Sequence, residues 1–283
     1  MRLYLDCIPC IIRQSIDITK RVIDDDNEQY RIIESILQII SHNVNKLSPP
    51  EMTQVIHRSL RKWSGIDDFF FEAKLRFNEL ALSMYPGLRN KMLNADDPWE
   101  YGLRMAIAGN IIDLGAKGMV SEEDIIKSIS EAQGQNLDGH IISELREHID
   151  KSDKIVYLGD NTGEIVFDKL FIEQLPKDKI TFVVRGSPIL NDALMADAEM
   201  TGLTKIVKVI DNGSDAPGTV ISDCDVKFID KLNEADVIIA KGQGNYETLY
   251  DSDLNVFFMF KLKCPIIAEK TGIETGGIAV IKS

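Results

Sequence analysis

Two aspartates in this chain are placed so that they could share one site. Asp160 and Asp192 each follow a run rich in Val and Ile, and 32 residues separate them, about one strand–helix–strand unit. Asn161 could add an amide oxygen beside Asp160. Carboxylate and amide oxygens, together with water, are the ligands that Mg²⁺ and Mn²⁺ take in proteins. The same residues could instead cap the helices that follow, because Asp and Asn favour helix N-termini.

Two cationic side chains occur in similar positions after apolar runs. Lys241 begins the glycine-rich turn KGQG, and Arg185 begins the turn RGSP. A phosphate oxygen would be a natural partner for either cation. A surface lysine beside a turn is the competing interpretation. Asn245 and Glu247 follow Lys241 in the same polar turn and count as further candidates for substrate contact.

Asn110 lies within the apolar stripe of a predicted helix. A buried amide must be hydrogen-bonded, so Asn110 either holds a helix junction or faces a substrate. Cys7 and Cys10 form a CxxC near the start of the chain. One CxxC supplies two of the four ligands of a structural zinc site, and four cysteines do not make a disulfide framework. A helix start at this position would stabilise a thiolate, so a catalytic redox, metal-binding or sensing role is the alternative to plain packing.

The first half of the chain has a helical period. Apolar residues recur every three or four positions, and we expect no strand there. Three helix starts are specific: Ser48 and Ser121 precede acidic residues in capping boxes, and Asp97 precedes a Pro. We expect the helix after Asp97 to continue through Leu114 and to end near Gly115.

The second half alternates short apolar runs with helical stretches. We predict strands over residues 154–158, 180–185, 205–210, 235–240, 265–268 and 278–281. Buried strands that alternate with helices indicate a parallel sheet covered on both faces. The boundary lies near residue 152, so the prediction is a helical domain over 1–152 packed on an α/β domain over 153–283. Ligands of such a sheet bind at the carboxyl ends of its strands, where the polar turns would lie.

The charge balance excludes several classes of partner. The chain has 45 Asp and Glu against 32 Lys and Arg, which gives a net charge of −13. This balance argues against nucleic acids and anionic membrane surfaces, which attract clustered cations. A small phosphorylated metabolite is compatible with it, because a bound cation reverses the local field. Since no run is long enough to span a membrane and no signal peptide is visible, we expect a cytoplasmic protein. Assembly into a homo-oligomer is left open.

Together these motifs resemble the metal-dependent damage-control phosphatase family, and in particular its short microbial members with an N-terminal CxxC. The order and spacing of the motifs make the resemblance specific, and it runs over nearly the whole chain. The matching segments are DCIPC at residues 6–10, AIAGNIID at 106–113, GDNTGE at 159–164, RGSPILND at 185–192 and KGQGNYE at 241–247.

The resemblance implies a helical N-terminal part packed on a Rossmann-like, mainly parallel, three-layer αβα sheet. It implies hydrolysis of small phosphate monoesters, often sugar phosphates or damaged phosphometabolites. It also implies a divalent cation, for which we expect Mg²⁺, Mn²⁺, Co²⁺ or Ni²⁺, held by Asp160, Asn161 and Asp192. The position of Lys241 would contact the phosphate. The predicted catalytic residues are Asp160, Asp192 and Lys241, and the predicted substrate-binding residues are Asn110, Arg185, Lys241, Asn245 and Glu247.

The expected chemistry is direct attack by a water that the cation activates. An aspartyl-phosphate route is less favoured, because an aspartate that ligates a metal is a poorer nucleophile. Two alternatives come from other functional classes. One is an S-adenosylmethionine-dependent carboxyl methyltransferase, which also uses a Rossmann-like sheet but lacks a need for paired carboxylates. The other is a non-enzymatic metal- or redox-sensing module built on Cys7 and Cys10.

Overall fold

A six-stranded sheet forms the centre of the protein in a computed structural model, which describes residues 1–111 and 121–283. The strand order is β3-β2-β1-β4-β5-β6. The first five strands are parallel and β6 is antiparallel to β5. The strands are β1 (Ile155–Leu158), β2 (Ile180–Val184), β3 (Lys208–Asp211), β4 (Val237–Lys241), β5 (Val256–Lys261) and β6 (Ile278–Lys282).

The chain leaves β1 toward β2 on one side and returns toward β4 on the other. β1 pairs with both of these strands in parallel register, so Leu158 lies opposite Val183 and also opposite Ala240. The loops after β1 and β4 therefore diverge at the carboxyl edge of the sheet. In doubly wound sheets this switch point is where ligands bind.

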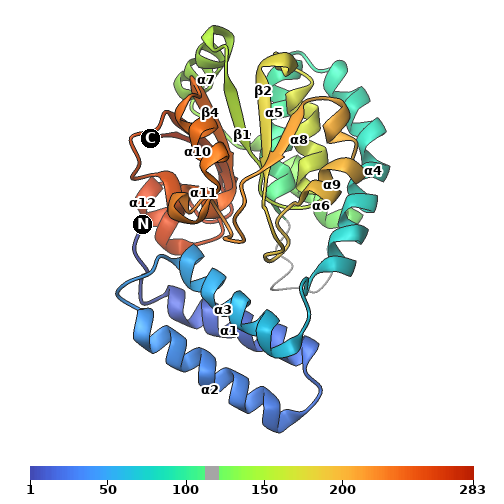
Figure 1. Ribbon diagram of the computed structural model, residues 1–283. Coiled ribbons are helices and arrows are strands. Elements are labelled where there is room, and N and C mark those ends of the chain that lie inside the picture. The colour runs from blue at the N-terminus through green and yellow to red at the C-terminus, as the bar shows by residue number, and fades with distance from the viewer. Residues whose placement is uncertain (112–120) are drawn as a thin grey trace.

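Helices cover both faces of the sheet (Figure 1). Alternate residues of β1 face opposite cores: Ile155 and Tyr157 lie in one, and Val156 and Leu158 in the other. The first core includes α4 (Phe71–Leu93), α5 (Pro98–Ala108), α6 (Glu122–Gly134), α7 (Gly139–Lys151), α8 (Glu164–Ile172) and α9 (Met195–Met200). The second includes α10 (Val226–Asn233), α11 (Gly242–Leu249) and α12 (Pro265–Thr271). The predicted α/β fold with covered sheet faces is confirmed.

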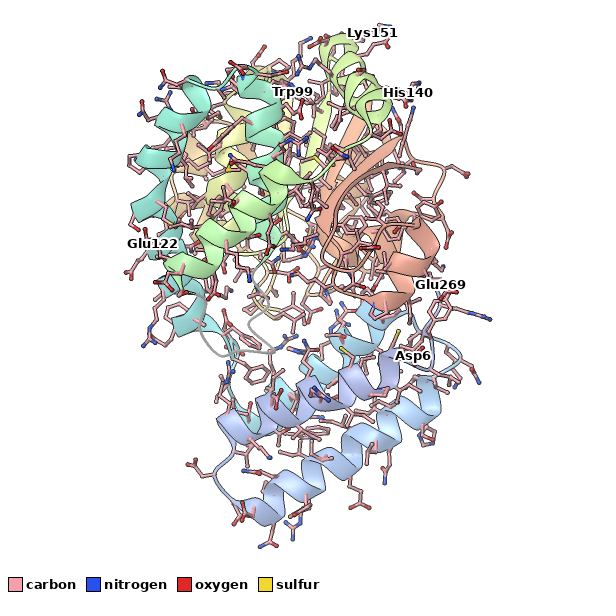
Figure 2. All side chains as sticks on the ribbon, turned by 180° about the vertical axis from the view of Figure 1, so that it is seen from behind. Asp6, Trp99, Glu122, His140, Lys151 and Glu269 are labelled. Atoms are coloured by element: carbon pink, nitrogen blue, oxygen red, sulfur yellow. The ribbon has the colours of Figure 1, made fainter. Side chains whose placement is uncertain are left out.

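Three helices form a separate core at the carboxyl edge of the sheet. They are α1 (Cys7–Val22), α2 (Asp26–Asn43) and α3 (Pro49–Ser64), and their shared apolar residues include Ile18, Ile36 and Met52. Figure 1 shows α3 facing the loops at that edge, and Figure 2 shows the start of α1 close to α12. There the Lys270 ammonium lies 5.2 Å from the centre of the Tyr4 ring. The domain boundary at residue 152 stays a prediction, but α5–α7 share their core with the sheet rather than with α1–α3. α4 contributes to both cores, with Phe77 in the three-helix core and Leu88 in the sheet core.

The predicted helix starts are confirmed. Ser48 and Ser121 each form a capping box, and the Asp97 side chain accepts from two backbone N–H groups of α5. In the described residues up to 152 there is no strand, as expected. The helix after Asp97 ends earlier than predicted, at Ala108, and a 3₁₀ turn follows over Gly109–Ile111. The predicted continuation through residues 114 and 115 lies outside the described residues.

The strand predictions contain two errors. Residues 265–268 are helical, because Pro265 takes the first helical position of α12, where its missing N–H costs nothing. The strand β5 was not predicted, although five of its six residues are fully buried in the sheet. The third strand also begins later than expected, at Lys208, after a 3₁₀ turn over Leu203–Lys205. No described helix has both the length and the apolar character that crossing a membrane requires.

Candidate active site

The loops after β1 and β2 are joined by backbone hydrogen bonds, which brings the two aspartates together. The Ala193 N–H donates to the Asp160 carbonyl at 2.8 Å, and the Thr162 N–H donates to the Asn191 carbonyl at 2.9 Å. Asn161 and Asp192 form an isolated antiparallel bridge. The parallel strands end side by side, and their loops then continue the pairing. Both carboxylates consequently reach the switch point, as the spacing of 32 residues predicted.

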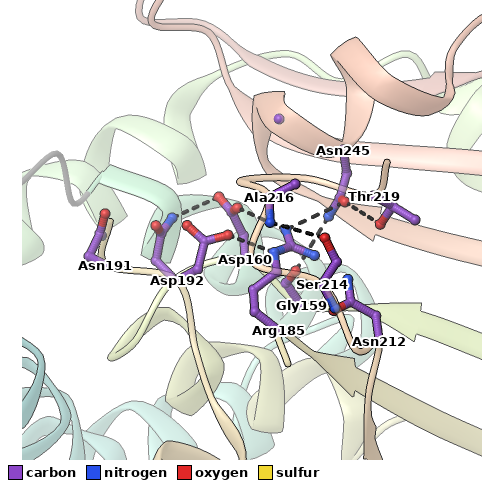
Figure 3. A network of polar contacts seen from close by, with 12 residues as sticks. Gly159, Asp160, Arg185, Asn191, Asp192, Asn212, Ser214, Ala216, Thr219 and Asn245 are labelled. Atoms are coloured by element: carbon purple, nitrogen blue, oxygen red, sulfur yellow. Dashed lines mark hydrogen bonds and ion pairs between the residues drawn. The ribbon is translucent and has the colours of Figure 1, made fainter. Parts of the chain in front are cut away.

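Arg185 lies beside the two carboxylates and contacts them unequally (Figure 3). Its Nε donates to Asp192 Oδ2 at 2.7 Å, whereas its Nη2 is 3.8 Å from Asp160 Oδ1. The guanidinium is buried, and its Nη1 has no hydrogen-bond partner among the residues described. One donor group of the arginine is thus left over at the centre of the site.

The electrostatics of this pair favour an added positive charge. Burial raises the pKa of Asp160 to about 8, and the neighbouring Asp192 and Glu164 add to the shift. Burial also raises the pKa of Asp192, although Arg185 opposes that change. Two carboxylates that cannot both ionise cheaply bind a cation or a proton. The side chain of Asp160 is 14% exposed, so the site is open to a small ion.

Two backbone features allow the loops to approach this closely. Gly242 has φ +78°, and a Cβ at this position would lie 2.0 Å from Asp160 Oδ2. Leu190 adopts φ 44°, which is unfavourable for a residue with a side chain and lies directly before the pair Asn191 and Asp192. The glycine leaves room for the carboxylate, and the strained leucine belongs to the turn that brings Asp192 back toward β1.

Three predicted site residues form one hydrogen-bonded group with Glu164. Asn110 Nδ2 donates to Asp160 Oδ2 at 2.9 Å and to Glu164 Oε2 at 2.8 Å. Asn161 Nδ2 donates to the same two oxygens at 2.7 and 2.8 Å. Asn110 is buried, so its amide is satisfied within the site. Asn110 thus holds a junction and also lies at the site, because it follows α5 and bonds to the loop that carries the candidate metal ligands.

Lys241 is the last residue of β4, at the carboxyl edge where the sequence placed it, but its ammonium points into the protein. Its ammonium is fully buried and donates to Ala106 O at 2.8 Å, Glu164 Oε1 at 2.5 Å and Asp168 Oδ1 at 2.7 Å. These contacts use all three N–H groups of the ammonium. Although burial favours a lower pKa, Asp168 and Glu164 hold the pKa of Lys241 above its usual value. The predicted phosphate contact is not supported, and the surface-lysine interpretation is wrong.

Of the two candidates in α11, Asn245 lies at the site and Glu247 lies away from it. Asn245 is buried, accepts from the Thr219 hydroxyl at 2.8 Å and lies 3.5 Å from Arg185 Nη2, so it supports the arginine (Figure 3). Glu247 lines a separate cavity of about 860 Å³ beside the N-terminal residues 1–6. Burial raises the pKa of Glu247 to about 7, with the N-terminal amino group opposing the shift. The helical repeat of α11 turns the two side chains to different sides.

Two arginines of α3 bind the loops that surround the site. Arg61 donates to the Pro188 carbonyl at 2.6 Å and also pairs with Asp215. Arg58 Nη2 lies 2.6 Å from Asp215 and 2.9 Å from Asp223. These contacts reach the loops after both β2 and β3. The three-helix core is thereby held over the carboxyl edge of the sheet.

Cys7 and Cys10 begin α1, in the first turn of the helix. Burial raises the pKa of the Cys7 thiol, and the nearby Glu247 and Cys264 add to that shift. A raised pKa lowers the thiolate fraction and with it the reactivity of the thiol. The stabilised thiolate expected from a helix start is not found at Cys7, so the geometry does not favour the sensing alternative.

The residues at the switch point fit a hard divalent cation. Asp160 and Asp192 offer carboxylate oxygens, and the hydrogen bonds of the Asn161 amide nitrogen leave its carbonyl oxygen as the atom able to ligate. No group of three His, Cys, Asp or Glu side chains suited to a metal occurs in residues 1–111 and 121–283. The candidate centre is consistent with this, because it has two carboxylates and an amide. Such mixed oxygen sites with water are typical of Mg²⁺ and Mn²⁺.

Sequence reasoning missed the residues beneath the site. Glu164 and Asp168 bind Lys241, and the Tyr157 hydroxyl donates to Asp168 Oδ1 at 2.8 Å. Glu164 stood in the motif GDNTGE and could have been found there. Asp168 and Tyr157 carried no such signal, because neither lies in a turn after a strand.

Comparisons with known proteins agree over nearly the full length. A family model described as "Damage-control phosphatase ARMT1-like domain" matches residues 3–278. An uncharacterized protein of Methanocaldococcus jannaschii is 36% identical over 98% of this chain and 94% of its own length. Two proteins named damage-control phosphatase, from Pyrococcus horikoshii and Archaeoglobus fulgidus, are 30% and 33% identical. These alignments cover 100% and 95% of this chain, and 99% and 95% of the relatives.

A solved structure supports the same assignment. The crystal structure of a DUF89 family protein from Pyrococcus horikoshii superposes with a TM-score of 0.89 at 30% identity, covering 100% of this chain and 99% of that one. The resemblance inferred from the motifs is therefore confirmed by full-length similarity in both sequence and fold. The chain belongs to the damage-control phosphatase family.

Proposed function

We propose that this protein hydrolyses small phosphate monoesters at the switch point between β1 and β4, with a divalent cation held by Asp160, Asn161 and Asp192. The observation that carries the proposal is the pair of aspartates, Asp192 buried and Asp160 partly exposed, that share Arg185. Membership of the damage-control phosphatase family supports a phosphatase role and does not favour the methyltransferase alternative. The substrate class, sugar phosphates or damaged phosphometabolites, rests on the resemblance of the motifs.

A divalent cation at this position would polarise the phosphoryl group and lower the pKa of the attacking water. Asp160 and Asp192 then have two roles: they hold the cation and accept hydrogen bonds that orient the water. Arg185 is the cationic side chain best placed to bind a phosphoryl oxygen, because its Nη1 is unpartnered in the described structure. It takes the role that the sequence had suggested for Lys241.

Charge development on the phosphoryl oxygens is the main demand on such a site. A positioned guanidinium that donates to those oxygens contributes about 2–4 kcal/mol to the transition state. Asn245 and Asp192 hold Arg185 on two sides, so little reorganisation is needed when the substrate binds. Direct attack by water is favoured over an aspartyl-phosphate, because both aspartates would be engaged as ligands of the cation.

The test is a panel of phosphorylated metabolites assayed after chelation and after return of Mg²⁺, Mn²⁺, Co²⁺ or Ni²⁺. We expect turnover of at least one phosphate monoester that chelation abolishes and one of these cations restores. Phosphate release that survives exhaustive chelation would contradict the metal requirement. Arg185→Gln should then lower kcat/KM on the order of 10²–10³-fold on each accepted ester.

A further inference from the structure

Glu164 lies beneath the site and hydrogen-bonds to Asn110, Asn161 and Lys241. Its Oε2 accepts from Asn161 Nδ2 at 2.8 Å, from the Asn161 backbone N–H at 3.3 Å and from Asn110 Nδ2 at 2.8 Å. Its Oε1 accepts from Lys241 Nζ at 2.5 Å. The side chain is fully buried. A carboxylate with these partners is held in place as a hydrogen-bond acceptor.

The orientation of the Asn161 amide decides whether that residue can bind a cation. An amide nitrogen carries its protons outward and cannot ligate a metal, whereas the carbonyl oxygen can. Glu164 is an acceptor at both oxygens, so the atom of Asn161 that faces it must be the nitrogen. The oxygen is consequently the atom that Asn161 has left for a cation.

We propose that Glu164 is a positioning residue that, together with Asp160 Oδ2, fixes the Asn161 amide with its carbonyl oxygen available to the cation. Lys241 acts behind it by holding the other oxygen of the carboxylate. The inference rests on the proposed function, since it concerns the same cation site. Residues that orient metal ligands in this way change metal affinity by about 10- to 100-fold when they are lost.

The neighbouring Asp168 provides a matched control. It also binds Lys241, at 2.7 Å, and is equally buried, but its other hydrogen bond comes from the Tyr157 hydroxyl rather than from Asn161 or Asn110. Asp168→Asn therefore removes one negative charge from the same buried cluster and leaves the hydrogen bonds from the Asn110 and Asn161 amides to Glu164 in place. Glu164→Gln removes the same charge and disturbs those hydrogen bonds.

The third variant, Glu164→Asp, distinguishes the effect of side-chain length from the effect of charge. It keeps the negative charge but shortens the side chain by one methylene, so the carboxylate cannot span from Lys241 to both amides. We expect Glu164→Asp and Glu164→Gln to weaken Mn²⁺ binding by about 10- to 100-fold. Asp168→Asn should change it by less than about threefold, because the Asn161 amide keeps its partner. Isothermal titration calorimetry and the electron paramagnetic resonance spectrum of Mn²⁺ measure the affinity, and thermal unfolding checks that each variant is folded.

The proposal is overturned if Mn²⁺ affinity depends on the charge of the cluster and not on the length of the side chain at position 164. In that outcome Glu164→Asp binds like the parent protein, and Glu164→Gln and Asp168→Asn lose affinity together. If Glu164→Gln does not fold, the comparison of Glu164→Asp with Asp168→Asn still decides the question. A parent protein that binds no Mn²⁺, Mg²⁺, Co²⁺ or Ni²⁺ would instead remove the metal site itself, which is a separate failure of the proposed function.

Discussion

Two buried clusters in this protein have the same charges and opposite properties. Each contains two carboxylates and one cation. In the lower cluster Lys241 contacts Glu164 and Asp168 at 2.5 and 2.7 Å, and all three side chains are 0% exposed. In the upper cluster Arg185 contacts Asp192 at 2.7 Å but stays 3.8 Å from Asp160, which is 14% exposed.

The comparison teaches that geometry, and not composition, distinguishes a structural charge cluster from a binding site. Burial raises the pKa of Asp168 to about 6 against the attraction of Lys241, whereas the pKa of Asp160 reaches about 8 beside Asp192 and Glu164. The ammonium of Lys241 reaches both of its carboxylates at hydrogen-bond distance and has no donor left, although Asp168 Oδ2 lacks a partner among the described residues. The guanidinium of Arg185 satisfies one and leaves a donor unused. The upper cluster is therefore the one that can accept a cation and an anionic substrate.

The largest expected effect is on the stability of the lower cluster. Lys241→Met leaves Glu164 and Asp168 buried without their cation, which should cost about 3–5 kcal/mol of unfolding free energy. Urea unfolding monitored by circular dichroism measures it. The matched control is Lys154→Met, which removes an exposed ion pair to Glu234 and should leave the unfolding free energy almost unchanged. Equal losses in the two variants would mean that Lys241 is not a structural cation.

The upper cluster should respond in the opposite way. Asp160→Asn and Asp192→Asn each remove an expected cation ligand, so we expect at least a roughly 100-fold loss of kcat/KM. Asp160→Asn should cost little stability, because Asp160 stays 3.8 Å from Arg185. Asp192→Asn also removes the hydrogen-bonded partner of the buried Arg185 and should lower stability more. In the parent protein Mn²⁺ at about 100 times its Kd should add about 2.7 kcal/mol to the unfolding free energy, and neither variant should gain it. Asp178→Asn, an exposed change before β2 at the other edge of the sheet, is the control. A fully active Asp192→Asn protein would make Asp192 a helix-capping residue only.

His57, a buried residue outside both clusters, should contribute to the pH dependence of the unfolding free energy. Burial lowers the pKa of His57 to about 3, with Arg61 adding to the shift and Asp215 opposing it, and its Nε2 has no partner among described residues. The unfolded chain takes up this proton near pH 6.5 and the folded one only near pH 3. Stability from His57 is thus complete above pH 6.5 and lost as the pH falls toward 3.

Between pH 7 and pH 5 this loss amounts to about 2 kcal/mol. His57→Phe, which keeps a ring beside Phe69, should remove that part of the slope in urea titrations at the two pH values. The difference between parent and variant isolates His57 from the carboxylates of the two clusters. An unchanged slope would show that the imidazole is protonated in the folded state.

The smallest effect is expected at the N-terminal thiols. Cys7→Ser combined with Cys10→Ser should leave phosphate release within about twofold under reducing conditions, because both residues belong to the first turn of α1 and not to either cluster. Assays of initial rate on one accepted ester measure this. A folded double variant that has lost hydrolysis would place the thiols in the catalytic machinery.

The sequence alone determined the fold class and the upper cluster. Parallel strands end at one edge, so residues that directly follow a strand, such as Asp160 and Arg185, can be located from the strand pattern. Asp192 follows from the same rule together with its spacing. The capping boxes at Ser48 and Ser121 are equally local, because an N-cap needs only the residues of its own first turn.

Only the tertiary structure decided the lower cluster. All nine residues of α8 are buried, including Glu164, Asp168 and Lys169, so its polar face points into the protein where an isolated helix would turn it to water. The partner that makes this possible is Lys241, from a strand more than 70 residues away in sequence. A lysine after a strand is compatible with a surface, a phosphate contact or a buried ion pair. The choice depends on which helix packs against that strand, because the desolvation of a charge is decided by its neighbours in space and not by those in sequence.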